Sequence, residues 1–188
     1  AVHAYHNNGT PFWASPFLTT KGIFSTPALG DLDKDGKMEV AFGCWDDKIY
    51  VLNYNGTKRW DYNNQDTIWS SPALADLTGD GNLEVIIGAD ASNISGGRLY
   101  VFDRNGNVLV QKAINQAIYS SPAIGDINGD NQLDIVVGTG PWFAGKGYNV
   151  YAWDRNGNLL PNWPVSTAGY MSPAPALADL NGNGILDV

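Results

Sequence analysis

The chain has 188 residues, with 19 acidic residues against 11 Lys and Arg, and a formal net charge of −8 at pH 7. Its single cysteine, Cys44, excludes an internal disulfide framework, and the lack of a basic stripe argues against a nucleic-acid partner. We expect upstream sequence to have been removed, because the chain shows no initiator Met, signal peptide or apolar transmembrane stretch.

Read from the N-terminus, the chain repeats one order of elements: a short apolar strand, an acidic loop, a β-branched run, an alternating strand, an Asn-Gly pair and a closing strand. The short apolar strands are expected at Pro27–Leu32, Pro72–Leu77, Pro122–Ile127 and Pro175–Leu180. The β-branched runs are Glu39–Gly43, Glu84–Gly88 and Asp134–Gly138. The alternating strands are Ala1–His6, Lys48–Asn53, Arg98–Asp103 and Asn149–Asp154, and closing strands follow at Thr57–Asp61 and Asn107–Lys112. No segment has a convincing helical period.

The Asn-Gly pairs predict hairpins. They stand at Asn8-Gly9, Asn55-Gly56, Asn105-Gly106 and Asn156-Gly157. Asn-Gly between two strand-like runs is typical of a type I′ turn, which needs a positive φ at both residues.

The acidic loop has nine residues, and its four copies start at Asp31, Asp76, Asp126 and Asp179. Oxygen-bearing side chains stand at positions 1, 3, 5 and 9, a Gly or Asn stands at position 6, and position 7 varies, as expected if only its carbonyl is used. A hard cation needs this layout, because Ca²⁺ takes six to eight oxygens and the chain must turn sharply to bring them together. A polar surface turn explains one copy equally well, but four copies favour calcium. Mg²⁺ prefers to keep several waters, and no Cys/His cluster is present for zinc.

We therefore predict up to four Ca²⁺ ions, held by Asp31, Asp33, Asp35, Lys37 and Glu39; Asp76, Thr78, Asp80, Asn82 and Glu84; Asp126, Asn128, Asp130, Gln132 and Asp134; and Asp179, Asn181, Asn183, Ile185 and Asp187. The loops contain four, three, three and two acidic residues in chain order, so most of the negative charge belongs to them. On this count the first loop should bind calcium most tightly and the fourth most weakly.

Loop starts are 45, 50 and 53 residues apart, a spacing typical of β-propeller blades. We predict an all-β fold of four-stranded antiparallel blades, forming one propeller domain or fragment over residues 1–188. Three blades are complete in sequence, and the fourth is split between the termini. Pairing the two ends would close a four-bladed ring. Alternatively, two copies could supply eight blades, or the chain could be a piece of a longer propeller. We favour a fragment or half of a larger ring.

Strings such as the one from Ser71 to Gly81, followed by Glu84–Gly88, resemble FG-GAP/VCBS repeats, the calcium-binding blades also found in integrin α-chain propellers. The resemblance covers essentially the whole chain, although Phe-Gly occurs only at Phe42-Gly43. It implies an extracellular adhesion, carbohydrate-binding or scaffold module. Some polysaccharide lyases of the rhamnogalacturonan type also look similar.

The face opposite the acidic loops carries the candidate ligand residues: Trp45, Asp46, Asp47, Trp69, Tyr119, Trp142, Phe143 and Tyr170. A glycan or an extracellular protein would suit these aromatics. The alternative for Phe24, Trp69, Tyr119 and Tyr170, which precede successive inner strands, is packing between blades.

We predict an extracellular or cell-surface module without catalytic residues, because open Asp/Asn loops suit millimolar calcium. Asn93 is the best glycosylation candidate among three sequons. Two alternatives stay open. The first is a polysaccharide lyase or hydrolase that would need Asp46, Asp47 or Asp90. The second is a structural surface or filament subunit completed by another chain.

Overall fold

The protein is all-β, as predicted. The structure, a computed structural model, describes residues 1–91, 96–140, 148–169 and 171–188, and this part contains twelve strands and no helix. The strands are β1 (Ala28–Gly30), β2 (Glu39–Gly43), β3 (Lys48–Leu52), β4 (Lys58–Asn63), β5 (Ala73–Ala75), β6 (Glu84–Ala91), β7 (Gly96–Phe102), β8 (Val108–Ile114), β9 (Ala123–Gly125), β10 (Asp134–Gly138), β11 (Tyr148–Trp153) and β12 (Val165–Thr167). They form three separate antiparallel sheets of four strands, each in sequence order.

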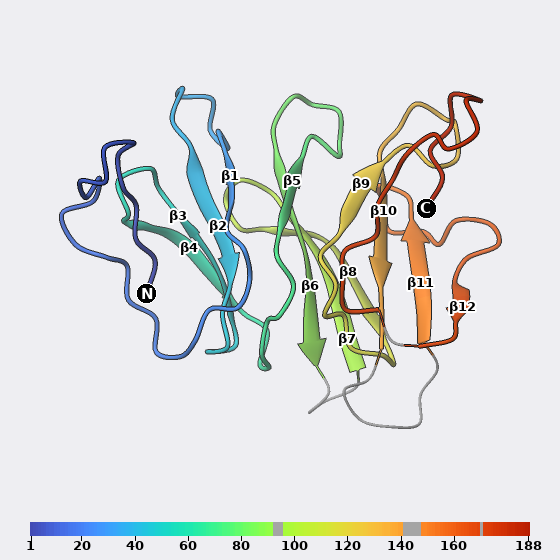
Figure 1. Cartoon of the computed structure of the whole chain (residues 1–188), viewed down its shortest axis with the longest axis horizontal. Helices are drawn as coiled ribbons and strands as arrows, with labels where there is room; N and C mark the ends of the chain where they lie inside the picture. Colours follow the sequence, from blue (N-terminus) through green and yellow to red (C-terminus); the bar gives the residue numbers. More distant parts are fainter. Residues whose placement is uncertain (92–95, 141–147, 170) are drawn as a thin grey trace.

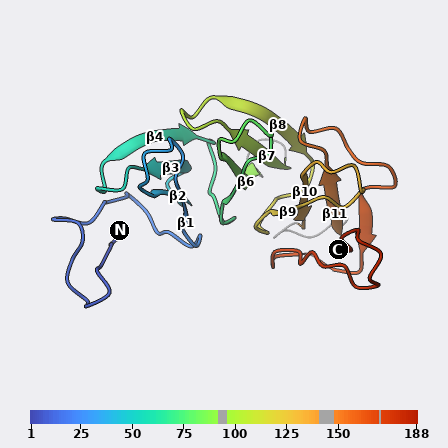
Figure 2. The ribbon, with the colours of Figure 1, turned by 90° about the horizontal axis from the view of Figure 1, so that it is seen from above.

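The three sheets stand side by side in an arc, like blades (Figure 2). On the inner side, the first strand β5 contacts the first strands β1 and β9 of its two neighbours, and the last strands β4 and β8 lie on the outer side. Because each sheet stacks against the next, the second strand of every blade is covered on both faces. All residues of β2, β6 and β10 are buried, which explains their unbroken β-branched runs.

The glycine at the fifth residue of each second strand lets the following segment approach closely. A Cβ atom added to Gly43 would lie 2.2 Å from Cγ2 of Ile68, and one added to Gly88 would lie 2.3 Å from Cγ2 of Ile118. Met171 takes the corresponding place against Gly138. The blades are therefore packed so closely at this point that no side chain fits.

Beside these glycines, serine side chains bind the lead of an inner strand to the second strand of the same blade and to the next blade. The Ser25 hydroxyl donates to the Gly43 carbonyl and accepts from the Gly43 amide, both at 2.9 Å, and Ser120 binds Gly138 in the same way. One residue later, the Ser71 amide donates to the Ser121 hydroxyl of the next blade at 3.0 Å. The Ser/Thr-rich lead to each inner strand thus acts as an inter-blade joint.

The Asn-Gly hairpins form, but the predicted type I′ turn is wrong. The Gly56 amide donates to the Asn53 carbonyl at 2.9 Å and the Asn53 amide to the Thr57 carbonyl at 2.8 Å, which defines a three-residue loop. Only the glycine of each pair has a positive φ, 83° at Gly56. This is the geometry of a turn followed by a glycine bulge, and Asn55 is used because its side chain accepts from the Thr57 amide at 3.1 Å.

The two terminal segments lie at opposite ends of the arc, so the split fourth blade is not confirmed (Figures 1 and 2). The N-terminal segment packs on the first sheet, and its Trp13 ring covers Gly56 as Trp60 covers Gly106. The expected strand Ala1–His6 makes only isolated bridges, at Val2 and Tyr5. The C-terminal segment packs on the third sheet, where Leu177 and Leu186 cover Gly125.

Candidate metal centre

All four acidic loops share one internal scaffold, built on the aspartate at position 1. In the second loop, the Asp76 carboxylate accepts from the backbone amides of Gly79 and Gly81, both at 2.8 Å. Asp126 and Asp179 make the corresponding bonds in their own loops. In the first loop, Asp31 accepts from the amides of Asp35 at position 5 and Gly36 at position 6. In the fourth loop these backbone hydrogen bonds, with Gly184 first, lower the pKa of Asp179. The aspartate at position 1 therefore stabilises the tight turn, or curl, of the loop backbone.

The curl needs two left-handed residues, of which sequence reasoning found one. Position 6 has a positive φ as predicted, for example 84° at Gly36. Position 4 is left-handed as well, including 62° at Lys34. The missed signal was the glycine at position 4 in the other three copies, Gly79, Gly129 and Gly182.

The position-9 carboxylate is buried in the first three loops. Glu39, Glu84 and Asp134 are 2%, 3% and 0% exposed, and each accepts a hydrogen bond from the backbone amide at position 2 at 2.9–3.0 Å. Burial raises the pKa of all three. In Asp134 the bond uses Oδ2, while Oδ1 is buried and has no hydrogen-bond partner among the described residues.

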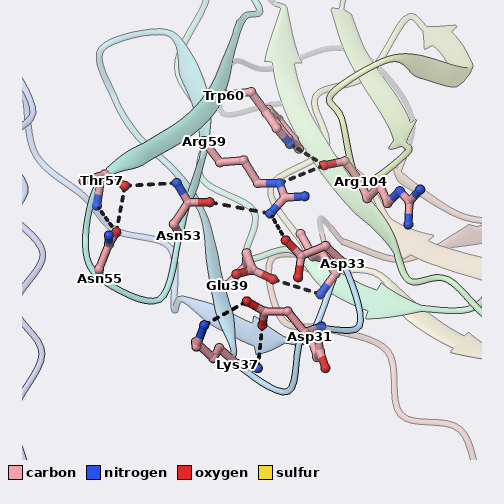
Figure 3. A network of polar contacts seen from close by, with 12 residues as sticks. Asp31, Asp33, Lys37, Glu39, Asn53, Asn55, Thr57, Arg59, Trp60 and Arg104 are labelled. Atoms are coloured by element: carbon pink, nitrogen blue, oxygen red, sulfur yellow. Dashed lines mark hydrogen bonds and ion pairs between the residues drawn. The ribbon is translucent and has the colours of Figure 1, made fainter.

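The first loop brings three carboxylates together (Figure 3). One oxygen from each of Asp31, Asp33 and Glu39 lies within 4.8 Å of the others. Asp33 Oδ1 is a second buried oxygen that lacks a partner in the described part of the chain. Buried carboxylate oxygens without donors are costly unless a cation faces them. These oxygens fit a hard cation and could hold a metal ion.

Position 7 varies in sequence because the loop uses its backbone. The amides of Lys37, Asn82, Gln132 and Ile185 each donate to the position-5 side chain at 2.8 Å. Lys37 adds an ion pair, with Nζ 3.1 Å from Asp35 Oδ2. Whether each of the twenty predicted ligands binds an ion stays a prediction.

At the opposite ends of the strands, four aromatic side chains form a continuous row, which we call the aromatic row: Phe24, Trp45, Trp69 and Tyr119. Ring centroids are 3.9 Å apart for Phe24 and Trp45, 4.4 Å for Trp45 and Trp69, and 5.6 Å for Trp69 and Tyr119. Phe24, Trp69 and Tyr119 therefore do pack between blades. Phe24 is nevertheless 60% exposed, and sequence reasoning had left it out of the ligand set.

A cavity of about 380 Å³ adjoins the row, lined by Phe24, Trp69, Tyr119, Ser121, Ser172, Pro173 and Ala174. Ser172 stands seven residues before Asp179, as Tyr119 does before Asp126, so the aromatic position does not recur in the fourth repeat at that offset. The predicted ligand residues Trp142, Phe143 and Tyr170 lie outside the described residues, as does Asn93.

Asp46 and Asp47 hold the N-terminal segment. Asp46 Oδ2 accepts from the Tyr50 hydroxyl at 3.0 Å and from the Thr20 amide at 3.2 Å, and Asp47 Oδ1 lies 3.8 Å from Lys21 Nζ. Tyr119 donates to Asp90 Oδ2 at 3.2 Å. The acidic residues on this face are thus bound to neighbouring segments.

Comparisons with solved structures show the fold. The C-terminal domain of PilY1 from Pseudomonas aeruginosa is 17% identical, with a TM-score of 0.60, covering 82% of this chain and 36% of that one. The exotype rhamnogalacturonan lyase YesX is 17% identical, with a TM-score of 0.59, covering 98% and 40%. A europium-containing methanol dehydrogenase is 18% identical, with a TM-score of 0.58, covering 84% and 27%. The chain thus spans between about a quarter and two-fifths of these proteins.

A comparison with curated proteins finds no match. Among the described residues, no helix has the length and apolar character needed to cross a bilayer. The family model of the FG-GAP-like repeat matches residues 31–87 and 76–137, which together span more than half of the chain and contain the first three acidic loops. The chain belongs to the FG-GAP-like repeat family.

Proposed function

We propose that the chain is a calcium-binding, extracellular propeller segment that stabilises its blades with Ca²⁺ and binds a glycan or a protein on the opposite face. The observation that carries the calcium part is that two of the three buried carboxylate oxygens without a partner among the described residues, Asp33 Oδ1 and Asp134 Oδ1, belong to the acidic loops; the third, Asp46 Oδ1, lies on the opposite face.

In each loop, positions 1, 3, 5 and 9 and the carbonyl of position 7 would hold the ion. The number and type of these oxygens suit Ca²⁺ better than Mg²⁺, which demands a tight octahedron and retains water. A bound Ca²⁺ would supply a cross-link between the start of the second strand and the loop before it. The chain itself supplies the curl, through the position-1 aspartate and the two left-handed residues.

The extracellular assignment follows from the openness of the loops. Asp35, Asp80 and Asp130 are exposed, which suits the weak sites of extracellular modules. A site with a dissociation constant of ~0.1 mM would stabilise the fold by about 1.4 kcal/mol at millimolar calcium. Several such contributions are a large part of a typical stability of 5–15 kcal/mol.

The aromatic row supports the binding part of the proposal. Four rings in contact, one of them 60% exposed, offer an apolar platform beside a cavity of about 380 Å³. Flat aromatic faces suit the apolar face of a sugar or an extended peptide.

We propose no catalytic step. The similarity to YesX concerns the fold, and the carboxylates that a lyase would need, Asp46, Asp47 and Asp90, bind Tyr50, Lys21 and Tyr119. A structural subunit completed by another chain remains the other alternative.

Two measurements test the proposal. Calorimetric titration of the EDTA-treated protein with Ca²⁺ should give saturable binding, with Mg²⁺ at the same concentration as the control. A glycan array and a panel of matrix proteins, screened with and without EDTA, should then identify a ligand. The Trp69→Ala variant should bind this ligand more weakly than the wild type does. Absence of calcium binding would refute the first part, and turnover of a polysaccharide would favour the lyase alternative.

A further inference from the structure

The first acidic loop differs from the others at position 3, and a residue on the outer strand of its blade differs with it. Position 3 is Asp33 in the first loop, and Thr78, Asn128 and Asn181 in the others. The third residue after the glycine of the hairpin pair is Arg59 in the first blade but Leu109 and Leu160 in the next two. The first loop is thus the only one of the four with a carboxylate at position 3, and its blade is the only one with a basic residue at the position of Arg59.

Arg59 and Asp33 are in direct contact (Figure 3). Arg59 Nη1 donates to Asp33 Oδ2 at 2.7 Å, and the two side chains are 18% and 32% exposed. The contact uses one oxygen of Asp33. The other, Oδ1, is the buried oxygen without a partner, on the carboxylate that approaches Asp31 and Glu39.

The guanidinium is held at this place by other groups. Arg59 Nε donates to the Arg104 carbonyl of the neighbouring blade at 3.2 Å, and Nη1 lies 3.5 Å from Asn53 Oδ1. Trp60, the next residue, donates to the same Arg104 carbonyl at 3.2 Å. A planar guanidinium with several fixed donors loses little freedom when it binds a carboxylate.

We propose that Arg59 is a built-in counter-charge and positioning residue of the first loop, an inference that rests on the proposed calcium binding. It reserves Asp33 Oδ1 for the ion by binding Oδ2, and it offsets one of the four carboxylates. With this offset, and with Lys34 and Lys37 within the loop, the first loop carries no more negative charge than the second and third loops. It is stabilised without calcium, and it binds calcium no more tightly than they do, contrary to the order expected from counting acids.

The amides of Gly36 and Gly81 report on the first and second loops separately, because each donates to the position-1 aspartate of its own loop. Calcium titrations followed by two-dimensional NMR should give similar midpoints for both in the wild type. In Arg59→Leu, which installs the residue of the other blades, the Gly36 midpoint should fall about tenfold through loss of a nearby positive charge, while the Gly81 midpoint stays unchanged.

Three further variants separate charge from packing. Arg59→Lys keeps the charge and should leave the Gly36 midpoint within about threefold of the wild type. Asp33→Asn should raise it about tenfold, and the double variant Arg59→Leu/Asp33→Asn, which copies the third loop, should return it close to the wild type. In EDTA, Arg59→Leu should lower the melting temperature more than it does in calcium.

The outcomes are distinguishable from failure of the proposed function. If neither glycine amide responds to calcium in the wild type, the calcium proposal itself is wrong. If both respond but Arg59→Leu leaves the Gly36 midpoint unchanged or raises it, the loops bind calcium and Arg59 is not a counter-charge. A melting temperature that Arg59→Leu lowers equally in EDTA and in calcium would assign Arg59 a purely structural role.

Discussion

Replacing Asp134 by Asn should change the stability of the protein in opposite directions with and without calcium. Asp134 is fully buried, its Oδ2 accepts from the Ile127 amide at 3.0 Å, and its Oδ1 has no partner among the described residues. Burial, together with repulsion from Asp130 and Asp126, raises the pKa of its carboxyl group. In EDTA at pH 7 the ionised carboxylate is therefore a cost, which the isosteric amide removes while its oxygen keeps the bond to Ile127.

The size of the effect follows from the buried charge, because the amide of Asn keeps a polar atom at the position of Oδ1 and removes only the desolvation of the charge and its repulsion by Asp130 and Asp126. A buried polar group without a partner costs about 1–3 kcal/mol. For a chain of this length 1 kcal/mol moves the melting temperature by about 2–4 °C. Asp134→Asn should thus melt roughly 2–12 °C above the wild type in EDTA, and below it in millimolar calcium, where a charged ligand has been lost.

Thermal melts followed by tryptophan fluorescence, in EDTA and in calcium, measure this crossing. The matched control is Asp103→Asn, which makes the same change outside the loops. Asp103 accepts from the amides of Asn105 and Asn107, both at 2.8 Å, so its replacement should destabilise equally in both buffers. If Asp134→Asn melts at or below the wild type in EDTA, the carboxylate is not an unpaired charge awaiting a cation, and the reasoning fails.

Three other predictions concern pH, packing and ligand binding. In EDTA, the free energy of unfolding should fall as the pH rises above 4.5, because burial raises the pKa values of Glu39 and Glu84 above this ordinary value and the stability that protonation provides is lost as the pH passes the raised values. Denaturant titrations check this, and calcium should reverse the trend. Gly88→Ala should cost about 1–3 kcal/mol, because the new Cβ would lie 2.3 Å from Ile118, whereas Gly169→Ala, with no atom within 4 Å, should be nearly neutral in the same titrations. Trp45→Ala should abolish binding of a ligand found by array screening but leave the calcium-induced shift in melting temperature unchanged; an equal loss of both would place Trp45 in the fold and not in the binding surface.

Elements governed by local chemistry could be predicted from the sequence. The bounds of β2 and β10 match the predicted β-branched runs, because an unbroken apolar run that ends in glycine indicates a strand buried on both faces. The oxygen-bearing side chains at positions 1, 3, 5 and 9 of the acidic loop could likewise be identified from the sequence. The failure over the Asn-Gly turn has a local cause as well: Asn55 bonds to Thr57 instead of adopting a positive φ, and both turn types share the same dipeptide.

Features that join distant residues could not be predicted. Arg59 lies 26 residues from Asp33 and becomes its partner only after the fourth strand folds back over the first loop. The aromatic row also depends on stacking between blades, since Phe24 and Trp69 come from neighbouring repeats. For such contacts the sequence limits the candidates, and the register between blades selects among them.

The two faces of the protein are joined by a rigid element. Strand β6 starts at Glu84, the buried position-9 carboxylate of the second loop, and continues past Gly88 to Asp90, which accepts from Tyr119 of the aromatic row at 3.2 Å. All eight residues of β6 are buried, so the strand is held along its whole length by both neighbouring sheets. A loop that loses its ion should therefore loosen the strand at one end without displacing the other. On this argument EDTA should reduce ligand binding at the aromatic row only near the temperature at which the calcium-free protein begins to unfold, and a strong loss well below that temperature would show direct coupling between the faces.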